Sequence, residues 1–96
     1  MATSEELVSA ICDLVAASPV AIPVTFANHG VEEVAALIGG VVETCFSRNL
    51  RLKKVVVGPE LADELGLIDG GTLPHGDHPA VQLEHGLGRR VRFVRV

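Results

Sequence analysis

The stretch Leu52–Gly66, "LKKVVVGPELADELG", joins an apolar segment to a glycine, a proline and a short helical pattern. Its first half passes from polar alternation to the run Val55–Val57, which is typical of a strand that becomes buried on both faces. Pro59 suits the first position of a helix and Gly66 a left-handed helix end. The stretch therefore predicts a central strand followed by a short helix from Pro59 to about Leu65.

A strand, a glycine turn and a helix start can also hold a phosphate group. Such a site needs free N–H groups at the helix start and no negative charge beside them. Here Pro59 removes one donor and Glu60 adds a charge, and neither a Walker lysine–serine pair nor GxGxxG follows. The turn is therefore interpreted as a connector.

Two longer helices are expected before this stretch. The first starts with a cap at Thr3 or Ser4 and ends at Ser18-Pro19. The second begins after Gly30, carries two glutamates in its first turn and runs to about Ser47. Apolar residues cover more than half of the second helix, which predicts burial on more than one side. These residues are Val31, Val34, Leu37, Ile38, Val41, Val42, Cys45 and Phe46.

The remaining segments predict strands. Residues 20–27, "VAIPVTFA", form an edge strand or an extended connection because Pro23 interrupts them. If they paired with the Leu50–Val57 strand, the second helix would be a right-handed crossover. "AVQLEH" (80–85) and "RRVRFVRV" (89–96), joined by "GLG", predict a C-terminal β-hairpin after the loop 68–79. The expected fold is a single α+β domain, residues 1–96, with two main helices on a mixed sheet of three or four strands.

Composition favours a cytoplasmic chain with an aliphatic core. The apolar runs end well before the roughly 20 residues of a membrane span, and "MATSEEL" lacks the positive start of a signal peptide. A net charge of −4 and only three aromatic residues, all Phe, make nucleic acid an unlikely partner. Cys12 and Cys45 are expected to be small buried hydrophobes, with a disulfide between them as the alternative.

The histidines suggest a metal site. His75, Asp77 and His78 lie in the loop and His85 at the next turn, and imidazole and carboxylate are ligands for zinc. A catalytic zinc site needs three protein ligands, so His75 and His78 must be joined by Asp77, His85 or His29. The alternative is that these are ordinary polar loop residues. No catalytic residue and no cofactor is predicted, since no serine nucleophile pattern is visible.

The glycine pair Gly39-Gly40 interrupts the second helix. Each glycine costs about 1 kcal/mol relative to Ala, so a close contact should compensate. Paired with the alanines four residues earlier, they allow another backbone to approach. That neighbour is either the first helix of the same chain or a helix of a second protomer. The interface residues predicted on this helix are Ala35, Ala36, Gly39 and Gly40.

Charge is divided along the chain. Residues 1–47 contain no Lys or Arg, and all eight basic residues fall within 48–54 or 89–95. If the last strand lies beside the Leu50–Val57 strand, their outward side chains form one basic patch opposite an acidic helical half. Such a surface suits head-to-tail association or an acidic partner, whereas the alternative is protection of exposed strand edges. The basic residues predicted at the interface are Arg51, Lys53, Arg90 and Arg92.

The C-terminal half carries a resemblance. "LKKVVVGPELADELG" followed by "HPAVQLEHGLGRRVRFV" resembles a pattern of small structural proteins of tailed bacteriophages and of the peripheral domain of their capsid subunits. The resemblance implies a virion or assembly protein that works by packing in copies, and it transfers no site residues.

Three functions remain open from the sequence. The preferred one is a non-enzymatic, self-associating assembly or interaction module, whose partner is itself, as a homo-oligomer, or another protein. The second is a metal-binding or metal-dependent hydrolytic domain that uses the His75–His85 region. The third is an inhibitor or adaptor that binds a host protein through the acidic helical face. A cytoplasmic location is expected, or the virion for a phage protein.

Overall fold

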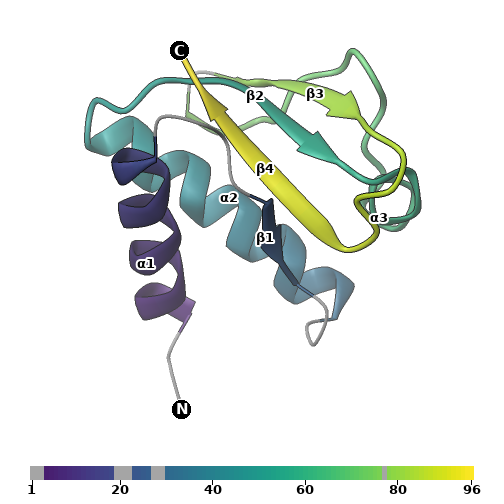
Figure 1. The fold of residues 1–96 in the computed structure, drawn as a ribbon, viewed down its shortest axis with the longest axis horizontal. Helices are drawn as coiled ribbons and strands as arrows, with labels where there is room; N and C mark the ends of the chain where they lie inside the picture. The colour runs from purple at the N-terminus through teal and green to yellow at the C-terminus, as the bar shows by residue number, and fades with distance from the viewer. Residues whose placement is uncertain (1–3, 19–22, 27–29, 77) are drawn as a thin grey trace.

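The expected α+β class is confirmed. The computed structural model describes residues 4–18, 23–26, 30–76 and 78–96, which form three helices and one four-stranded mixed sheet (Figure 1). The elements are α1 (Ser4–Ala17), β1 (Pro23–Thr25), α2 (Val31–Ser47), β2 (Leu52–Val57), α3 (Pro59–Leu65), β3 (Ala80–Leu83) and β4 (Arg90–Arg95).

Helix ends follow the local signals. α2 begins directly after Gly30 and has both glutamates in its first turn. α3 has Pro59 at its start and ends at Gly66, whose φ of 72° is left-handed. These bounds match the expected ones because glycine, proline and first-turn carboxylates act within a single turn of helix.

The strand order is β1-β4-β2-β3, with β4 antiparallel to β1 and β2, and β3 parallel to β2. The central position of β2 and the edge position of β1 are as predicted. The pairing of the two C-terminal strands as a hairpin is wrong, because β2 lies between them. β1 also pairs with β4 rather than with β2. Val55–Val57 are buried, and a strand buried in this way needs a neighbour on each side.

A β-bulge interrupts β2. Leu52 pairs with Arg95 and Lys54 with Val94, so two steps along β2 match one step along β4. A bulge of this kind leaves one residue, here Lys53, outside the regular ladder. Leu52 and Val55 can therefore both face the core while both intervening lysines face away from it.

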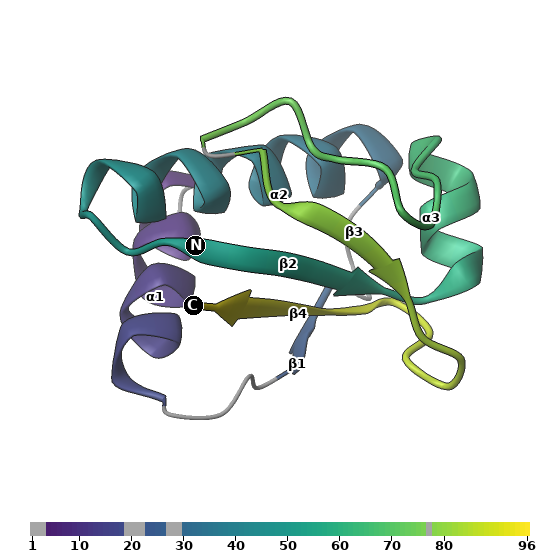
Figure 2. The same ribbon diagram turned by 90° about the horizontal axis from the view of Figure 1, so that it is seen from above.

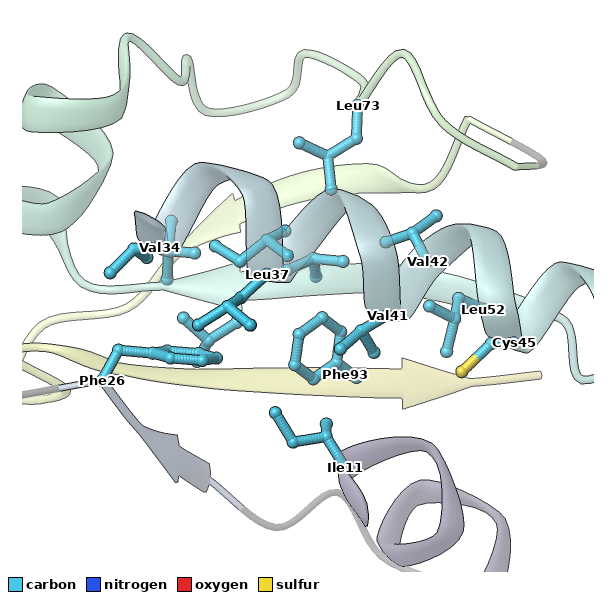
Figure 3. Packing of buried hydrophobic residues seen from close by; sticks show 14 of the residues in the cluster. Ile11, Phe26, Val34, Leu37, Val41, Val42, Cys45, Leu52, Leu73 and Phe93 are labelled. Carbon is cyan, nitrogen blue, oxygen red and sulfur yellow. The ribbon is translucent and has the colours of Figure 1, made fainter. Parts of the chain in front are cut away.

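Both long helices lie on one face of the sheet. Figure 2 looks onto the other face, with α1 and α2 behind the strands. The core lies between the layers, where Leu37 and Val41 of α2 pack over Phe93 of β4 and Ile11 enters from α1 (Figure 3). Among the described residues, no helix is long and apolar enough to cross a membrane.

Two apolar residues of α2 depart from the expected burial. Val31 is 39% exposed and Phe46 is 47% exposed. They lie in the first and last turns of the helix, whereas the buried residues run from Val34 to Cys45. Apolar spacing predicted the buried stripe but not where the sheet beneath it ends.

The outer edge of β3 is covered by the loop that precedes it. Val81 exchanges backbone hydrogen bonds with this loop: Gly70 N donates to Val81 O at 2.9 Å, and Val81 N donates to Gly71 O at 2.8 Å. At the end of the strand, Leu83 N donates to a side-chain oxygen of Asp69 at 3.1 Å. Backbone groups that would otherwise stay open at this edge are therefore satisfied within the chain.

Gly58, between β2 and α3, serves a close backbone contact. A Cβ atom at this position would lie 2.5 Å from Gly88 O, in the turn that leads into β4. The glycine of the "VVVGPE" segment thus has a packing role within the connector.

Candidate association surface

Four basic residues of β2 and β4 lie on the face of the sheet that none of the described helices covers, and we call them the basic face: Lys53, Lys54, Arg90 and Arg92. Alternation along β4 places Val91 and Phe93 in the core, and so directs Arg90 and Arg92 to the opposite side. The register sets Val56 opposite Arg92 and Lys54 opposite Val94. The pairing of β2 with β4, which the charge argument required, therefore brings the two basic segments together.

The residues of the basic face differ in the hydrogen bonds and ion pairs that they form within the chain. Arg92 forms an ion pair with Glu84 at 3.0 Å, and Lys54 Nζ donates to Gln82 Oε1 at 2.7 Å. Arg90 donates to the carbonyls of Gly86 and Leu87 in the preceding turn, at 2.8 and 3.0 Å. The side chain of Lys53, at the bulge, is exposed.

The predicted residue Arg51 lies just before β2 and is exposed, and its carbonyl accepts a hydrogen bond from Val96 N at 3.0 Å. Three other arginines form contacts with other elements of the same chain. Arg48 pairs with Asp13 at 2.8 Å, joining α2 to α1, and Arg89 pairs with Glu64 of α3 at 2.8 Å. Arg95 donates to Ala16 O at 3.1 Å. Some of the basic residues that are grouped in the sequence thus bind other parts of the same chain, and fewer positive charges face a partner than the sequence suggests.

A groove of about 280 Å³ opens between α1 and α2, across the sheet from the basic face. Its lining combines apolar residues with two exposed carboxylate residues, one from each helix, and we call it the acidic groove. The lining residues are Glu5, Val8, Ser9, Glu33, Ala36, Leu37, Gly40 and Thr44. The sequence did not indicate this groove, because its shape depends on how the two helices pack.

The two helix glycines have neighbours within the chain. A Cβ atom on Gly40 would lie 3.1 Å from a methyl carbon of Val8 in α1. A Cβ atom on Gly39 would lie 2.8 Å from His75 Nε2, in the loop before β3. Ala35 and Ala36 are exposed, and Ala36 lines the acidic groove. The neighbour of Gly40 is therefore the first helix of the same chain, which is one of the two neighbours predicted from the sequence. The contact of Gly39 with a loop histidine was not predicted.

The described histidines make separate side-chain contacts, although His78 N donates to His75 O at 2.9 Å. His75 Nδ1 lies 3.8 Å from Glu43 Oε1, which also accepts a hydrogen bond from Gly76 N at 3.0 Å. His78 Nδ1 lies 3.2 Å from Leu73 O, and His85 is exposed beyond β3. Asp77 and His29 fall outside the described residues. Within the described ranges, no three His, Cys, Asp or Glu residues are grouped so that they could hold a metal ion.

The two cysteines meet in the core between α1 and α2. Both are fully buried free thiols, and their Sγ atoms lie 3.5 Å apart. Cys12 Sγ also lies 3.6 Å from Val41 O, to which it donates. Burial raises the pKa of Cys12, and burial followed by the neighbouring thiol raises the pKa of Cys45 to about 12. Neutral, buried thiols act as small hydrophobes, which is the role expected for them.

Comparisons with known proteins add no assignment. No family model matches the sequence, and neither a curated protein nor a solved structure shows significant similarity to it.

Proposed function

We propose that the protein is a non-enzymatic, self-associating interaction module whose basic face is its association surface. The observation that carries the proposal is that no helix in the described part of the chain covers one side of the sheet (Figure 2), and that the register of β2 with β4 brings basic residues of both strands to that side. The helical layer holds the opposite charge, with six acidic residues and no Lys or Arg between residues 1 and 47.

Charge of this kind acts mainly on the rate and orientation of encounter. Exposed ion pairs contribute about 0–1 kcal/mol each, but several pairs on one surface can steer and orient a partner. The resemblance to phage structural proteins agrees with a role in which copies pack together. In that setting the protein would be a virion or assembly component.

Lys53 and Lys54 suit a test best, because Lys53 is exposed at the bulge and the hydrogen bond of Lys54 to Gln82 is itself exposed. Arg90 and Arg92 hold the turn before β4 and pair with Glu84, so changing them would also disturb the fold. Lys53→Gln with Lys54→Gln removes two positive charges at the bulge. A control with the same net charge, Ser47→Glu with Ile68→Glu, changes two exposed positions away from the basic face.

Light scattering at about 10 mM and about 1 M salt measures the outcome, since the Debye length falls from roughly 30 Å to 3 Å between them. We expect wild type and control to associate at low salt and the lysine variant to remain closer to monomeric mass. Edge protection does not apply to these lysines, because β2 lies between β4 and β3. If they are ordinary solvated surface residues, the variant and the wild type will show the same mass under both conditions, and the proposal fails.

A further inference from the structure

We infer that Cys12 and Cys45 are a redox-responsive pair, which closes to a disulfide between α1 and α2 when a peroxide oxidises the two thiols. Neither the basic face nor association between copies takes part, so this site is independent of the proposed function. The disulfide is a covalent modification that fixes α1 to α2.

The two thiols already meet across the interface between the helices. Their Sγ atoms lie 3.5 Å apart, whereas a disulfide joins two sulfurs at about 2.05 Å, so each sulfur has to move by about 0.7 Å. Both side chains are fully buried, at 0% exposure. The sequence contains two cysteines in all, so an internal disulfide has a single possible pairing.

Contacts before and after the thiol pair along α2 hold α1 in register. A Cβ atom on Gly40 would lie 3.1 Å from a methyl carbon of Val8, which shows that the two helices approach closely there. After the pair, Arg48 donates to Asp13 Oδ1 at 2.8 Å and to Ser9 Oγ at 3.2 Å. The reduced protein therefore keeps the two sulfurs within reach of each other before any oxidant arrives.

The hydrogen bonds of the pair assign different roles to the two thiols. Cys45 Sγ donates to Cys12 Sγ, which in turn donates to Val41 O at 3.6 Å. Burial raises the pKa of Cys12, while the hydrogen bond from Cys45 and the charge of Arg48 act in the opposite direction. Burial and then the neighbouring thiol raise the pKa of Cys45 to about 12. Cys12 is therefore the nucleophile and Cys45 the thiol that resolves the intermediate.

The oxidation balances with hydrogen peroxide as the oxidant. The thiolate of Cys12 attacks one peroxide oxygen, the O–O bond breaks, and hydroxide leaves with the electron pair, which gives a sulfenic acid. The sulfur of Cys45 then loses its proton and displaces hydroxide from the sulfenic sulfur, which forms the S–S bond. The proton of each thiol ends on a hydroxide, so two thiols and one hydrogen peroxide give one disulfide and two waters.

Peroxide reaches the buried pair when α1 opens. This helix lies at one end of the helical layer (Figures 1 and 2), and among the described elements it packs mainly on α2. Local opening of such a peripheral element requires less free energy than global unfolding. Because Cys12 belongs to α1 itself, the same motion uncovers it. We therefore expect the native protein to oxidise more slowly than the unfolded chain, but to completion.

The disulfide should stabilise the fold. It joins residues 33 positions apart, so it restricts the unfolded chain far more than the folded one. A crosslink that closes a loop of this size should raise the melting temperature by about 10–20 °C in a domain of this length. The shift is a readout of the native protein and needs no substitution.

The experiment compares reduced wild-type protein before and after treatment with hydrogen peroxide in the absence of denaturant. Free thiols are counted by alkylation in urea once the peroxide is removed, since oxidation of the single methionine, Met1, also changes the mass. We expect monomeric protein without free thiols, the higher melting temperature, and a return of both values after dithiothreitol. Cys12→Ala and Cys45→Ala are matched controls, and peroxide should not raise the melting temperature of either.

Three results would overturn the inference. The thiols could stay free in the folded protein and disappear only in the urea-unfolded chain, which would make them inert core residues. Disulfides could form only between molecules, which non-reducing electrophoresis detects as a doubled mass. The oxidised protein could melt at or below the temperature of the reduced protein, which would mean that the native fold does not accommodate the bond.

Discussion

Substitution of Gly58 by alanine should destabilise the fold through a backbone clash. The added Cβ would lie 2.5 Å from Gly88 O, where ordinary contact begins at 3.4 Å, so the turn has to move by about 0.9 Å. That turn is tied in place at its far end, because Arg89 O accepts from Phe26 N and Arg90 N donates to Leu87 O. Overpacking of this kind costs about 1–3 kcal/mol.

Gly30 provides a matched control. It precedes α2 as Gly58 precedes α3, with φ and ψ of −72° and 166° against −71° and 150°. Among the described residues, nothing lies within 4 Å of a Cβ added at Gly30. The effects of alanine on the unfolded chain and on helix capping are therefore shared by the two variants, and their difference isolates the clash.

Urea unfolding of wild type and both variants gives the free energies. We expect Gly58→Ala to be less stable than Gly30→Ala by about 1–3 kcal/mol, which lowers the melting temperature by about 4–8 °C per kcal/mol for a domain of this size. A difference between the two variants below about 0.5 kcal/mol would refute the close-approach role of Gly58.

Three further predictions concern the interior and the loop. Gly39→Ala should destabilise the protein, because the new Cβ would lie 2.8 Å from His75 Nε2 and displace that side chain. In a His75→Ala background the same substitution should instead stabilise the protein by about 1 kcal/mol, because alanine favours a helix more than glycine does. Urea unfolding measures both effects, and equal effects in the two backgrounds would contradict the contact. Burial raises the pKa of Cys45 to about 12, so this thiol ionises at lower pH in the unfolded chain than in the folded one. The free energy of unfolding should therefore fall by up to about 1.4 kcal/mol per pH unit between about pH 9 and pH 12. Cys45→Ala should flatten this decline, and an unchanged slope would count against the prediction. Purified protein should carry no stoichiometric zinc by elemental analysis, and bound zinc that disappears in His78→Ala would restore the metal-site interpretation.

The local elements could be predicted because their signals are local. Pro59 and Gly66 act within one turn of helix, and the alternation of Val91 and Phe93 with arginines needs only the geometry of a strand. Strand partners are another matter. The "GLG" turn indicates a reversal, and a reversal fits both a paired hairpin and a chain that passes the end of β2. The burial of Val55–Val57 contained the information that β2 needs two neighbours, but not which strands they are.

The candidate surfaces were predictable only in part. The charge division of the sequence indicated a basic patch, and the pairing of β2 with β4 was the condition attached to it. Simple alternation places Lys53 and Lys54 on opposite faces, so their common direction depends on the bulge. The acidic groove and the meeting of Cys12 with Cys45 depend on the packing of α1 against α2, which brings together residues about thirty positions apart.

The bulge also marks one point in the central strand β2 where a residue can be deleted without turning the core residues to the other face of the sheet. Because Lys53 stands outside the ladder, deletion of one lysine would leave Leu52 and Val55 separated by a single residue and hence still on the same face of the sheet. Elsewhere in β2, loss of one residue would turn the following valines toward solvent. A gene encoding this protein can therefore lose or regain one codon at this position and keep its hydrophobic core in phase, while the number of positive charges on the outer face changes.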